Sequence, residues 1–221
     1  MHVTLLTHTP DPDAVVAAAA RLCYSDADIA ALKKRMRGEK AAAMVDKLLS
    51  LGHASPLEHV GFTFGIEGVS RALSHQLVRH RIASYSQQSQ RYVRMDDFEY
   101  VVPPSIANST EARAKYSATM ETLRDAYLSL LEFAPAEDAR YVLPNACTTK
   151  LVATLNARSL YNFFALRCCM RAQWEIRALA WEMLRLVSAV APHVFSQAGP
   201  DCWRPQGCGE GEMSCGSPPS R

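Results

Sequence analysis

The sequence contains no long apolar run and no secretory leader. Its apolar runs all fall short of the roughly 18 residues that a membrane-spanning helix needs. The start, Met1-His2-Val3-Thr4, lacks the basic and then apolar pattern of a signal peptide. Hydrophobic residues make up 48% of the 221 residues, which excludes a disordered chain. We therefore expect a globular, cytoplasmic protein with no membrane partner.

Acidic residues are missing from two long stretches. Residues 68–95 and 139–174 together hold ten arginines and lysines and no Asp or Glu, although the net charge of the whole chain is only +2. Nine of the ten are arginines. Arginine presents a planar fork of donors that matches phosphate and carboxylate oxygens, whereas a merely solvated face would mix lysine with acids. The stretches predict a binding surface for a ligand with several negative charges. The alternative is a set of scattered surface arginines.

Cysteine occurs in an odd number, seven, which argues against a disulfide framework in an intracellular protein. Cys202, Cys208 and Cys215 lie in a segment rich in glycine and proline, and their gaps of five and six residues exceed those of a typical zinc ligand pair. We expect residues 196–221 to form a mobile tail and the chain to hold no metal. Cys147 and the Cys168-Cys169 pair are more typical of buried small side chains than of nucleophiles.

Helical patterns predominate along the chain. Their spacing predicts helices over residues 11–23, 39–51, 69–80, 105–133 and 176–190. A period-two pattern predicts a strand over residues 60–66. We expect another strand over residues 148–155, and a loop and a strand over residues 84–93. No repeat or linker divides the chain. We expect a helix-rich α/β (α+β) fold with one domain over residues 1–195.

Polar side chains gather at the end of the predicted helix 69–80. Gln76, Arg79 and His80 would converge there, and Ser86 to Gln90 are five amide or hydroxyl residues in an unbroken run. A nucleotide requires charge for phosphate, with amides and hydroxyls for sugar and base edges. The alternatives are a polar surface strand and a binding module for RNA or single-stranded DNA. The stacking platforms of such a module would be Tyr85, Tyr92 and Tyr100.

Four short motifs stand in order along the chain. One is Arg79-His80-Arg81, followed after seven residues by Ser89. The others are His53-Ala54-Ser55-Pro56-Leu57-Glu58-His59, Asn156-Ala157-Arg158-Ser159-Leu160-Tyr161-Asn162-Phe163, and Arg167 followed by Ala172-Gln173-Trp174-Glu175-Ile176. Chance would have to place each motif independently. In their order and spacing, over roughly residues 4–195, they resemble the flavin-dependent thymidylate synthases.

The resemblance implies an enzyme with that family's fold, in which mixed helices pack on a small, mainly antiparallel sheet. It implies synthesis of dTMP from dUMP, with methylenetetrahydrofolate as carbon donor and NADPH as reductant through bound FAD. It also implies a homotetramer with active sites at subunit interfaces and no nucleic-acid partner. These ligands carry the phosphates and carboxylates that the acid-free stretches predict. Another flavin-linked nucleotide-modifying enzyme is a further alternative.

The matched motifs also imply which residues bind each ligand. For FAD they are Ser55, Arg79, His80, Arg81, Asn156, Arg158 and Asn162, with Gln87 as a further contributor. For dUMP they are Gln76, Arg79, Ser89, Gln90, Arg91, Arg140 and Arg167, with Gln87 and Gln88 in the same loop. Arg167 is the implied catalytic residue, because a guanidinium against the N3 and O2 edge of uracil would stabilise negative charge that develops there. No catalytic role is implied for Cys147, Cys168 or Cys169.

The chain departs from the family pattern at two points. Ser86-Gln87 stands where some members have Asn-Glu, and Ala165 and Arg171 stand where some have an Asn-x-x-His arrangement. The implied contacts therefore rest on the arginines more than on these positions. The resemblance does not extend to the segment beyond about residue 196.

Overall fold

The computed structural model describes residues 1–204 and 207–220. The chain divides into two compact units. Unit 1 comprises Met1–His2, Ile66–Arg79 and Ser86–Val152, and unit 2 comprises Val3–Gly65, His80–Tyr85 and the described residues from Ala153 onward. Each acid-free stretch therefore contributes arginines to both units.

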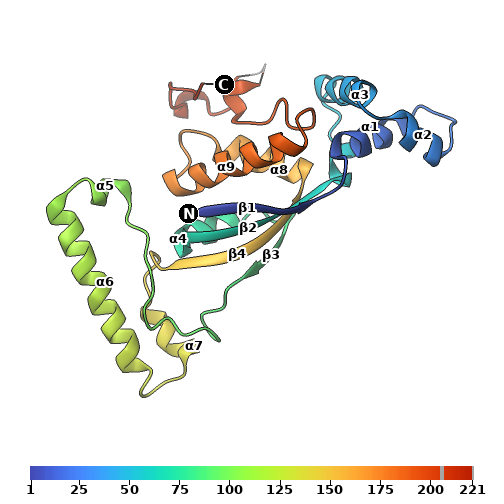
Figure 1. Cartoon of the computed structure of the whole chain (residues 1–221). Coiled ribbons are helices and arrows are strands. Elements are labelled where there is room, and N and C mark those ends of the chain that lie inside the picture. The colour runs from blue at the N-terminus through green and yellow to red at the C-terminus, as the bar shows by residue number, and fades with distance from the viewer. Residues whose placement is uncertain (205–206, 221) are drawn as a thin grey trace. The chain divides into compact units, whose positions relative to one another are not determined.

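The strands form a four-stranded antiparallel sheet in the order β1-β2-β4-β3 (Figure 1). They are β1 His2–His8, β2 Gly61–Ser70, β3 Ser84–Gln87 and β4 Thr148–Asn156. Every second residue of β2 is buried from Phe62 to Ile66, which is the period-two pattern that a half-buried strand requires. The helix-rich α+β fold and the strands predicted over residues 60–66 and 148–155 are confirmed. Strand β1 was not expected from the sequence.

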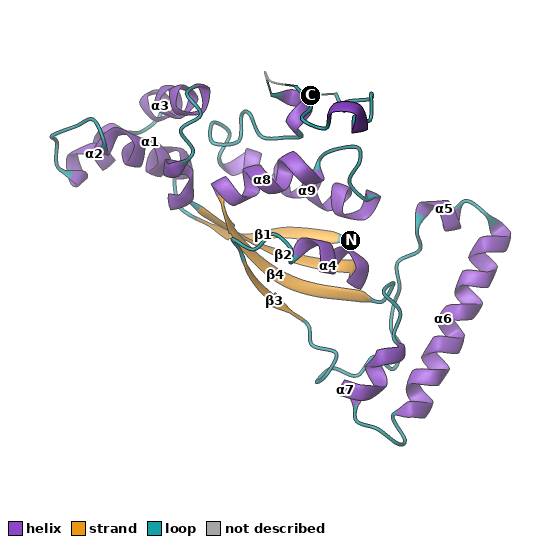
Figure 2. Cartoon of the chain, turned by 180° about the vertical axis from the view of Figure 1, so that it is seen from behind, coloured by secondary structure: helices purple, strands orange, loops and turns teal. Residues whose placement is uncertain are grey.

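Unit 1 carries one long helix and several short ones. They are α4 Arg71–Leu77, α5 Pro104–Ala107, α6 Thr110–Leu130, α7 Ala136–Ala139 and the 3-10 helix η2 Arg140–Val142. The prediction of a single helix over residues 105–133 is wrong, because the chain turns between α5 and α6 (Figure 2). Ser109 has extended backbone there, and its Oγ accepts a hydrogen bond from the Ala112 N–H at 3.3 Å, which starts α6 as a new helix.

The prediction of a helix over residues 69–80 is wrong at both ends. Val69 and Ser70 belong to β2, and the Ser70 Oγ accepts a hydrogen bond from the Leu73 N–H at 3.0 Å, so that Ser70 is the N-cap of α4. The helix ends at Leu77. Arg79 and His80 therefore follow the helix and are assigned to different units.

Unit 2 contains most of the helices. They are α1 Pro12–Leu22, α2 Ile29–Arg35, α3 Glu39–Ser50, α8 Ala157–Arg167 and α9 Trp174–Val190, with 3-10 helices η1 Ser55–His59, η3 Asp201–Trp203 and η4 Gly211–Met213. The helices predicted over residues 11–23, 39–51 and 176–190 are confirmed. Gly52, at φ +70°, follows the end of α3 as the pattern predicted. Helices α2 and α8 were not expected from the sequence.

An aromatic core fixes α8 in unit 2. Phe163 and Phe164 of α8 are fully buried, and Phe195 packs edge-on against Phe164 and against Phe62 of β2. The two helices α8 and α9 lie side by side (Figures 1 and 2). Buried aromatic side chains contribute large apolar areas, so the ends of α8 are held firmly in place. Among the described residues, no helix combines the length and the apolar character that a membrane crossing would require.

Candidate functional site

Helix α8 and its N-cap carry four of the predicted site residues in unit 2, namely Asn156, Arg158, Asn162 and Arg167. Asn156 is its N-cap, and the Asn156 Oδ1 accepts a hydrogen bond from the Ser159 N–H at 2.8 Å. Arg158 and Asn162 are exposed and four residues apart, so they lie on the same face of the helix. Arg158 forms an ion pair with Glu58 of η1. That pair brings the motif around Ser55 against the motif that opens α8.

Arg167 is the last residue of α8 and contacts His80 of the Arg79-His80-Arg81 motif. The Arg167 Nε–H donates a hydrogen bond to the His80 Nε2 at 3.1 Å, so that His80 carries its proton on Nδ1. The His80 ring also packs edge-on against Phe163, with 4.9 Å between ring centroids. The Tyr85 hydroxyl donates to the His80 carbonyl oxygen at 3.0 Å. Two contacts thus fix the imidazole that orients Arg167, and the third holds the backbone of His80.

The environment keeps His80 neutral. The pKa of His80 is lowered to about 4, first by burial and then by the positive charge of Arg167. Burial also lowers the pKa of Arg167. Because a guanidinium stays protonated at any physiological pH, Arg167 keeps its charge while His80 remains an acceptor. The pair is a preorganised cation whose terminal nitrogens are left for another partner.

The unit 2 residues assigned to FAD by the resemblance fit that cofactor chemically. Ser55 is exposed at the start of η1, and Arg81 is exposed next to His80. Guanidinium and hydroxyl donors match the oxygens of a diphosphate, and amide and imidazole groups match the polar edges of a flavin and its hydroxylated chain. The donor set of this surface therefore suits FAD.

In unit 1, Gln87 is engaged inside the fold. Its Nε2 donates to the Ser74 Oγ at 3.0 Å and to the Thr149 Oγ1 at 3.1 Å. Because an amide nitrogen has two hydrogens, both are used and only the Oε1 is left for a ligand. The backbone N–H of Gln88 likewise donates to the Lys150 carbonyl at 3.0 Å. These bonds tie β3 to α4 and β4 and fix the start of the loop that follows.

That loop carries Ser89, Gln90 and Arg91. The Arg91 N–H donates to the Ser89 Oγ at 3.2 Å, and the Val93 N–H donates to the Ser89 carbonyl at 3.0 Å. The Arg91 guanidinium lies over the Tyr92 ring, 5.1 Å from its centroid. At the end of α4, the Gln76 Nε2 donates to the Ala72 carbonyl at 3.3 Å, and Arg79 is exposed. The loop is ordered by its own hydrogen bonds.

Arg71 is a residue of unit 1 that the motifs did not identify. Its pKa is lowered first by burial and then by the positive charge of Arg140, and no carboxylate of the described residues pairs with it. The Arg140 Nε donates only to a backbone carbonyl, that of Glu137, at 3.0 Å. Two half-buried guanidiniums that repel each other favour an anion between them. The acid-free stretch already contained Arg71, and that was the available signal.

The predicted residues thus fall into two sets. Unit 1 holds the dUMP set except for Arg167, and unit 2 holds the FAD set except for Arg79 and Gln87. The unit 1 set is Gln76, Arg79, Gln87, Gln88, Ser89, Gln90, Arg91 and Arg140; the unit 2 set is Ser55, His80, Arg81, Asn156, Arg158, Asn162 and Arg167.

Cys147 and Cys168 are fully buried thiols. Burial raises the pKa of each to about 12. Neither is therefore a thiolate near neutral pH, and the thiolate is the nucleophilic form of cysteine.

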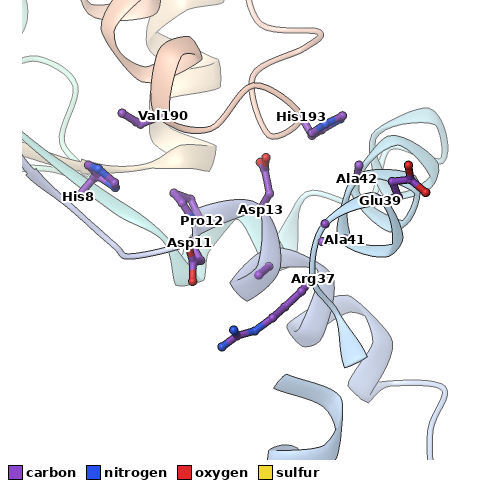
Figure 3. Close-up of a pocket in the computed structure, with 12 residues that line it drawn as sticks. His8, Asp11, Pro12, Asp13, Arg37, Glu39, Ala41, Ala42, Val190 and His193 are labelled. Atoms are coloured by element: carbon purple, nitrogen blue, oxygen red, sulfur yellow. The ribbon is translucent and has the colours of Figure 1, made fainter. Parts of the chain in front are cut away.

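A separate cavity of about 640 Å³ lies in unit 2 among β1, α1, α3 and the end of α9 (Figure 3). Asp13 reaches toward the segment of His193, where its Oδ1 accepts a hydrogen bond from the Val194 N–H at 2.9 Å. Arg37 extends away from that segment. The cavity contains none of the predicted site residues, and its lining mixes acids with bases, so it favours no ligand charge.

Comparison with known proteins supports the motif assignment. A family model described as thymidylate synthase complementing protein matches residues 4–193. Proteins named flavin-dependent thymidylate synthase are 58% identical to this chain in Geobacter sulfurreducens, 51% in Clostridium tetani and 40% in Pyrococcus abyssi. The alignments cover 98%, 97% and 96% of this chain and 94%, 92% and 91% of those proteins. They disfavour the nucleic-acid module. The chain belongs to the flavin-dependent thymidylate synthase family.

Proposed function

We propose that this protein converts dUMP to dTMP, with methylenetetrahydrofolate as carbon donor and NADPH as reductant through bound FAD. Family membership supports thymidylate synthesis with a flavin. The carbon donor, the reductant and an assembly as a homotetramer with active sites at subunit interfaces are part of the proposal. In such an assembly, the FAD set and the dUMP set that form one site need not come from one protomer.

The observation that carries the proposal is the hydrogen bond from Arg167 to His80, because it joins two motifs that are far apart in the sequence. Holding the Nε of Arg167 fixes the plane of its guanidinium. Four of its five N–H groups then remain for the planar edge of a pyrimidine. Since His80 is neutral, the full positive charge of the pair resides on Arg167.

Arg167 acts on charge that develops in the uracil ring. When bound and reduced, the flavin supplies the hydride that the pyrimidine takes up. Negative charge on the N3 and O2 side of uracil is stabilised by Arg167, whose orientation is set before the substrate arrives. Removal of one preorganised donor of this kind lowers kcat by about 100-fold to 1,000-fold. No enzyme thiolate takes part, in keeping with the buried, protonated Cys147 and Cys168.

The remaining residues bind and orient. We assign the FAD diphosphate and sugar to the exposed donors of Ser55, Arg81, Arg158 and Asn162. We assign the dUMP phosphate to the guanidiniums of Arg140 and Arg91, with Ser89 as a hydroxyl donor and not as a nucleophile. Holding flavin and pyrimidine together in reacting geometry is the main contribution of these contacts.

An omission assay tests the proposed function. The purified chain is supplied with FAD, dUMP, methylenetetrahydrofolate and NADPH, and dTMP is measured by chromatography together with NADPH oxidation. We expect dTMP only when all four are present. NADPH oxidation that is independent of dUMP, without dTMP, would instead support a different flavin-linked reaction.

A further inference from the structure

Four of the seven cysteines line one cavity of unit 2. The cavity, of about 560 Å³, lies between the connection from α8 to α9 and the C-terminal segment, and Cys169, Cys202, Cys208 and Cys215 all line it. All four are free thiols; Cys169 and Cys202 are half-buried, and Cys208 and Cys215 are exposed. The sequence places Cys169 far upstream of the other three, so only the fold brings the four together.

The C-terminal segment is anchored at both ends of the loop that carries Cys208 and Cys215. Trp203 packs on Trp181 of α9, with 5.3 Å between ring centroids, and its Nε1–H donates to the Pro219 carbonyl at 2.8 Å. A Cβ on Gly199 would lie 2.3 Å from the Trp203 ring, so glycine is required there. Arg171 and Glu210 form an ion pair across the same cavity. The loop is nevertheless exposed and has almost no buried apolar side chains of its own.

We propose that Cys169, Cys202, Cys208 and Cys215 bind one structural Zn²⁺ ion. Four cysteine sulfurs are a common closed ligand set for structural zinc, which they surround as a tetrahedron. Thiolates are soft ligands that favour zinc over magnesium or calcium. Each thiol gives its proton to solvent as its sulfur binds, so the complex of Zn²⁺ with four thiolates carries a charge of −2.

The proposal departs from the expectation drawn from spacing. Gaps of five and six residues within the C-terminal segment pointed away from zinc, but that count omitted Cys169, which lies on another connection. Within residues 1–204 and 207–220, no three Cys, His, Asp or Glu side chains already stand as a ligand set. Binding must therefore draw the sulfurs in, to about 2.3 Å from the metal. Gly207, Gly211 and Gly216 have positive φ and provide the backbone freedom for this closure.

The site has a consequence for α8. Cys169 follows Arg167 by two residues, so a metal bound to Cys169 fixes the chain immediately after the guanidinium that the proposed function uses. The zinc ion holds the end of α8 to the C-terminal segment and takes no part in the reaction.

Metal content of the full-length protein tests the proposal. We expect about one zinc per chain by plasma mass spectrometry, and Co²⁺ in its place should give the thiolate-to-cobalt charge-transfer absorption of tetrahedral sulfur coordination. Each of C202S, C208S and C215S should lower zinc affinity by more than the roughly 10-fold to 100-fold typical of losing an outer-shell partner. The matched control is C23S, because Cys23 is a free, exposed thiol outside the cavity, and it should bind zinc as the unchanged chain does.

Differential alkylation of the unchanged protein avoids any variant that fails to fold. With zinc present, Cys169, Cys202, Cys208 and Cys215 should be protected from a maleimide while Cys23 is labelled, and a chelator should expose all four. The proposal is overturned if the four label as fast as Cys23 in the presence of zinc, or if the zinc content stays far below one per chain. It is also overturned if the purified protein shows the absorption of an iron–sulfur cluster, which would assign the same four thiols to a different group.

Discussion

Two groups of arginines, one in each unit, differ in the contacts that hold their guanidiniums. In unit 2, Arg158 and Arg171 each pair with a glutamate, and Arg167 donates to His80. In unit 1, Arg71 and Arg140 are half-buried close to each other, and no carboxylate among the described residues pairs with either. A paired arginine is oriented in advance, whereas two unpaired cations favour an anion that neutralises them both.

This difference separates the orientation of a reacting group from the binding of a phosphate. The sequence alone indicated one surface for both. The stretches without acids predicted a single surface for several negative charges. The structure instead shows fixed donors at Arg158, Arg167 and Arg171 in unit 2, which suit a reaction that needs orientation. It shows uncompensated charge at Arg71 and Arg140 in unit 1, which suits the phosphate of a substrate. Variants in the two units should therefore change different kinetic constants.

The largest effect is expected for Arg167→Ala. The variant should keep its fold and its flavin but lose about 100-fold to 1,000-fold in kcat for dTMP formation, because an oriented cation is removed from the reacting edge. The measurement is kcat per bound flavin. The matched control is Arg185→Ala, since Arg185 is exposed on α9 and, among the described residues, forms an ion pair only with the neighbouring Glu182. Unchanged turnover in Arg167→Ala would show that this guanidinium has no catalytic role.

Arg71→Ala should raise the KM for dUMP by about 10-fold or more with little change in flavin content, because hydrogen bonds to a charged group contribute about 1.5–3 kcal/mol. Steady-state kinetics and flavin absorbance of the same preparations measure the two quantities. Arg113→Ala, an exposed arginine on α6 of the same unit, is the control. A loss of flavin with an unchanged KM for dUMP would reverse the assignment of the two units.

A change in pH is expected to have a moderate effect on the free energy of unfolding. The pKa of His80 is about 4 in the folded protein against an ordinary value of 6.5, so the unfolded state binds more protons between these two values. The free energy of unfolding should therefore fall as pH decreases from about 6.5 to about 4, with no contribution from His80 above that window. Urea unfolding of the unchanged chain and of His80→Gln measures it. In His80→Gln, the free energy of unfolding should depend less steeply on pH between about 4 and 6.5. An identical dependence in the two proteins would contradict a half-buried, neutral His80.

The smallest effect is expected for Cys147→Ala and Cys168→Ala. Each removes a buried thiol at a cost to stability of about 1 kcal/mol, and dTMP formation should persist because neither residue is a thiolate. Activity is compared at equal flavin content and at a temperature where both variants are folded. Complete loss of activity in a folded, flavin-loaded variant would point to a thiol mechanism.

The sequence predicted those elements whose apolar spacing was regular. Residues 39–51 and 176–190 form helices as expected, because their buried residues recur every three to four positions. The break at Ser109 was missed because a serine inside a helical pattern becomes an N-cap only when its backbone is extended. The strand β1 was missed because Val3 is its only buried residue, so it shows no clear alternation.

The residues of the candidate site could be predicted from the sequence where they belong to a motif. The motifs indicated Arg167 and His80, but not that the one donates to the other, because residues 87 positions apart meet only in the fold. Motif matching could not identify Arg71, since no motif includes it. Spacing could not reveal that Cys169 lines the same cavity as the cysteines of the C-terminal segment, because spacing describes one segment at a time.

Three expectations from the sequence stay predictions. They are the assignments of individual residues to FAD and dUMP, the single domain over residues 1–195 and the mobile tail.

Release of tritium from dUMP labelled at C5 tests the central claim most directly, because methylation of that carbon must displace its hydrogen. The comparison is between the unchanged chain and Arg167→Ala at equal flavin content, with NADPH and methylenetetrahydrofolate present or omitted. The account predicts release from the unchanged chain only with both co-substrates, and a large decrease in Arg167→Ala. No release from a folded, flavin-loaded chain, or equal release from the two proteins, would contradict it.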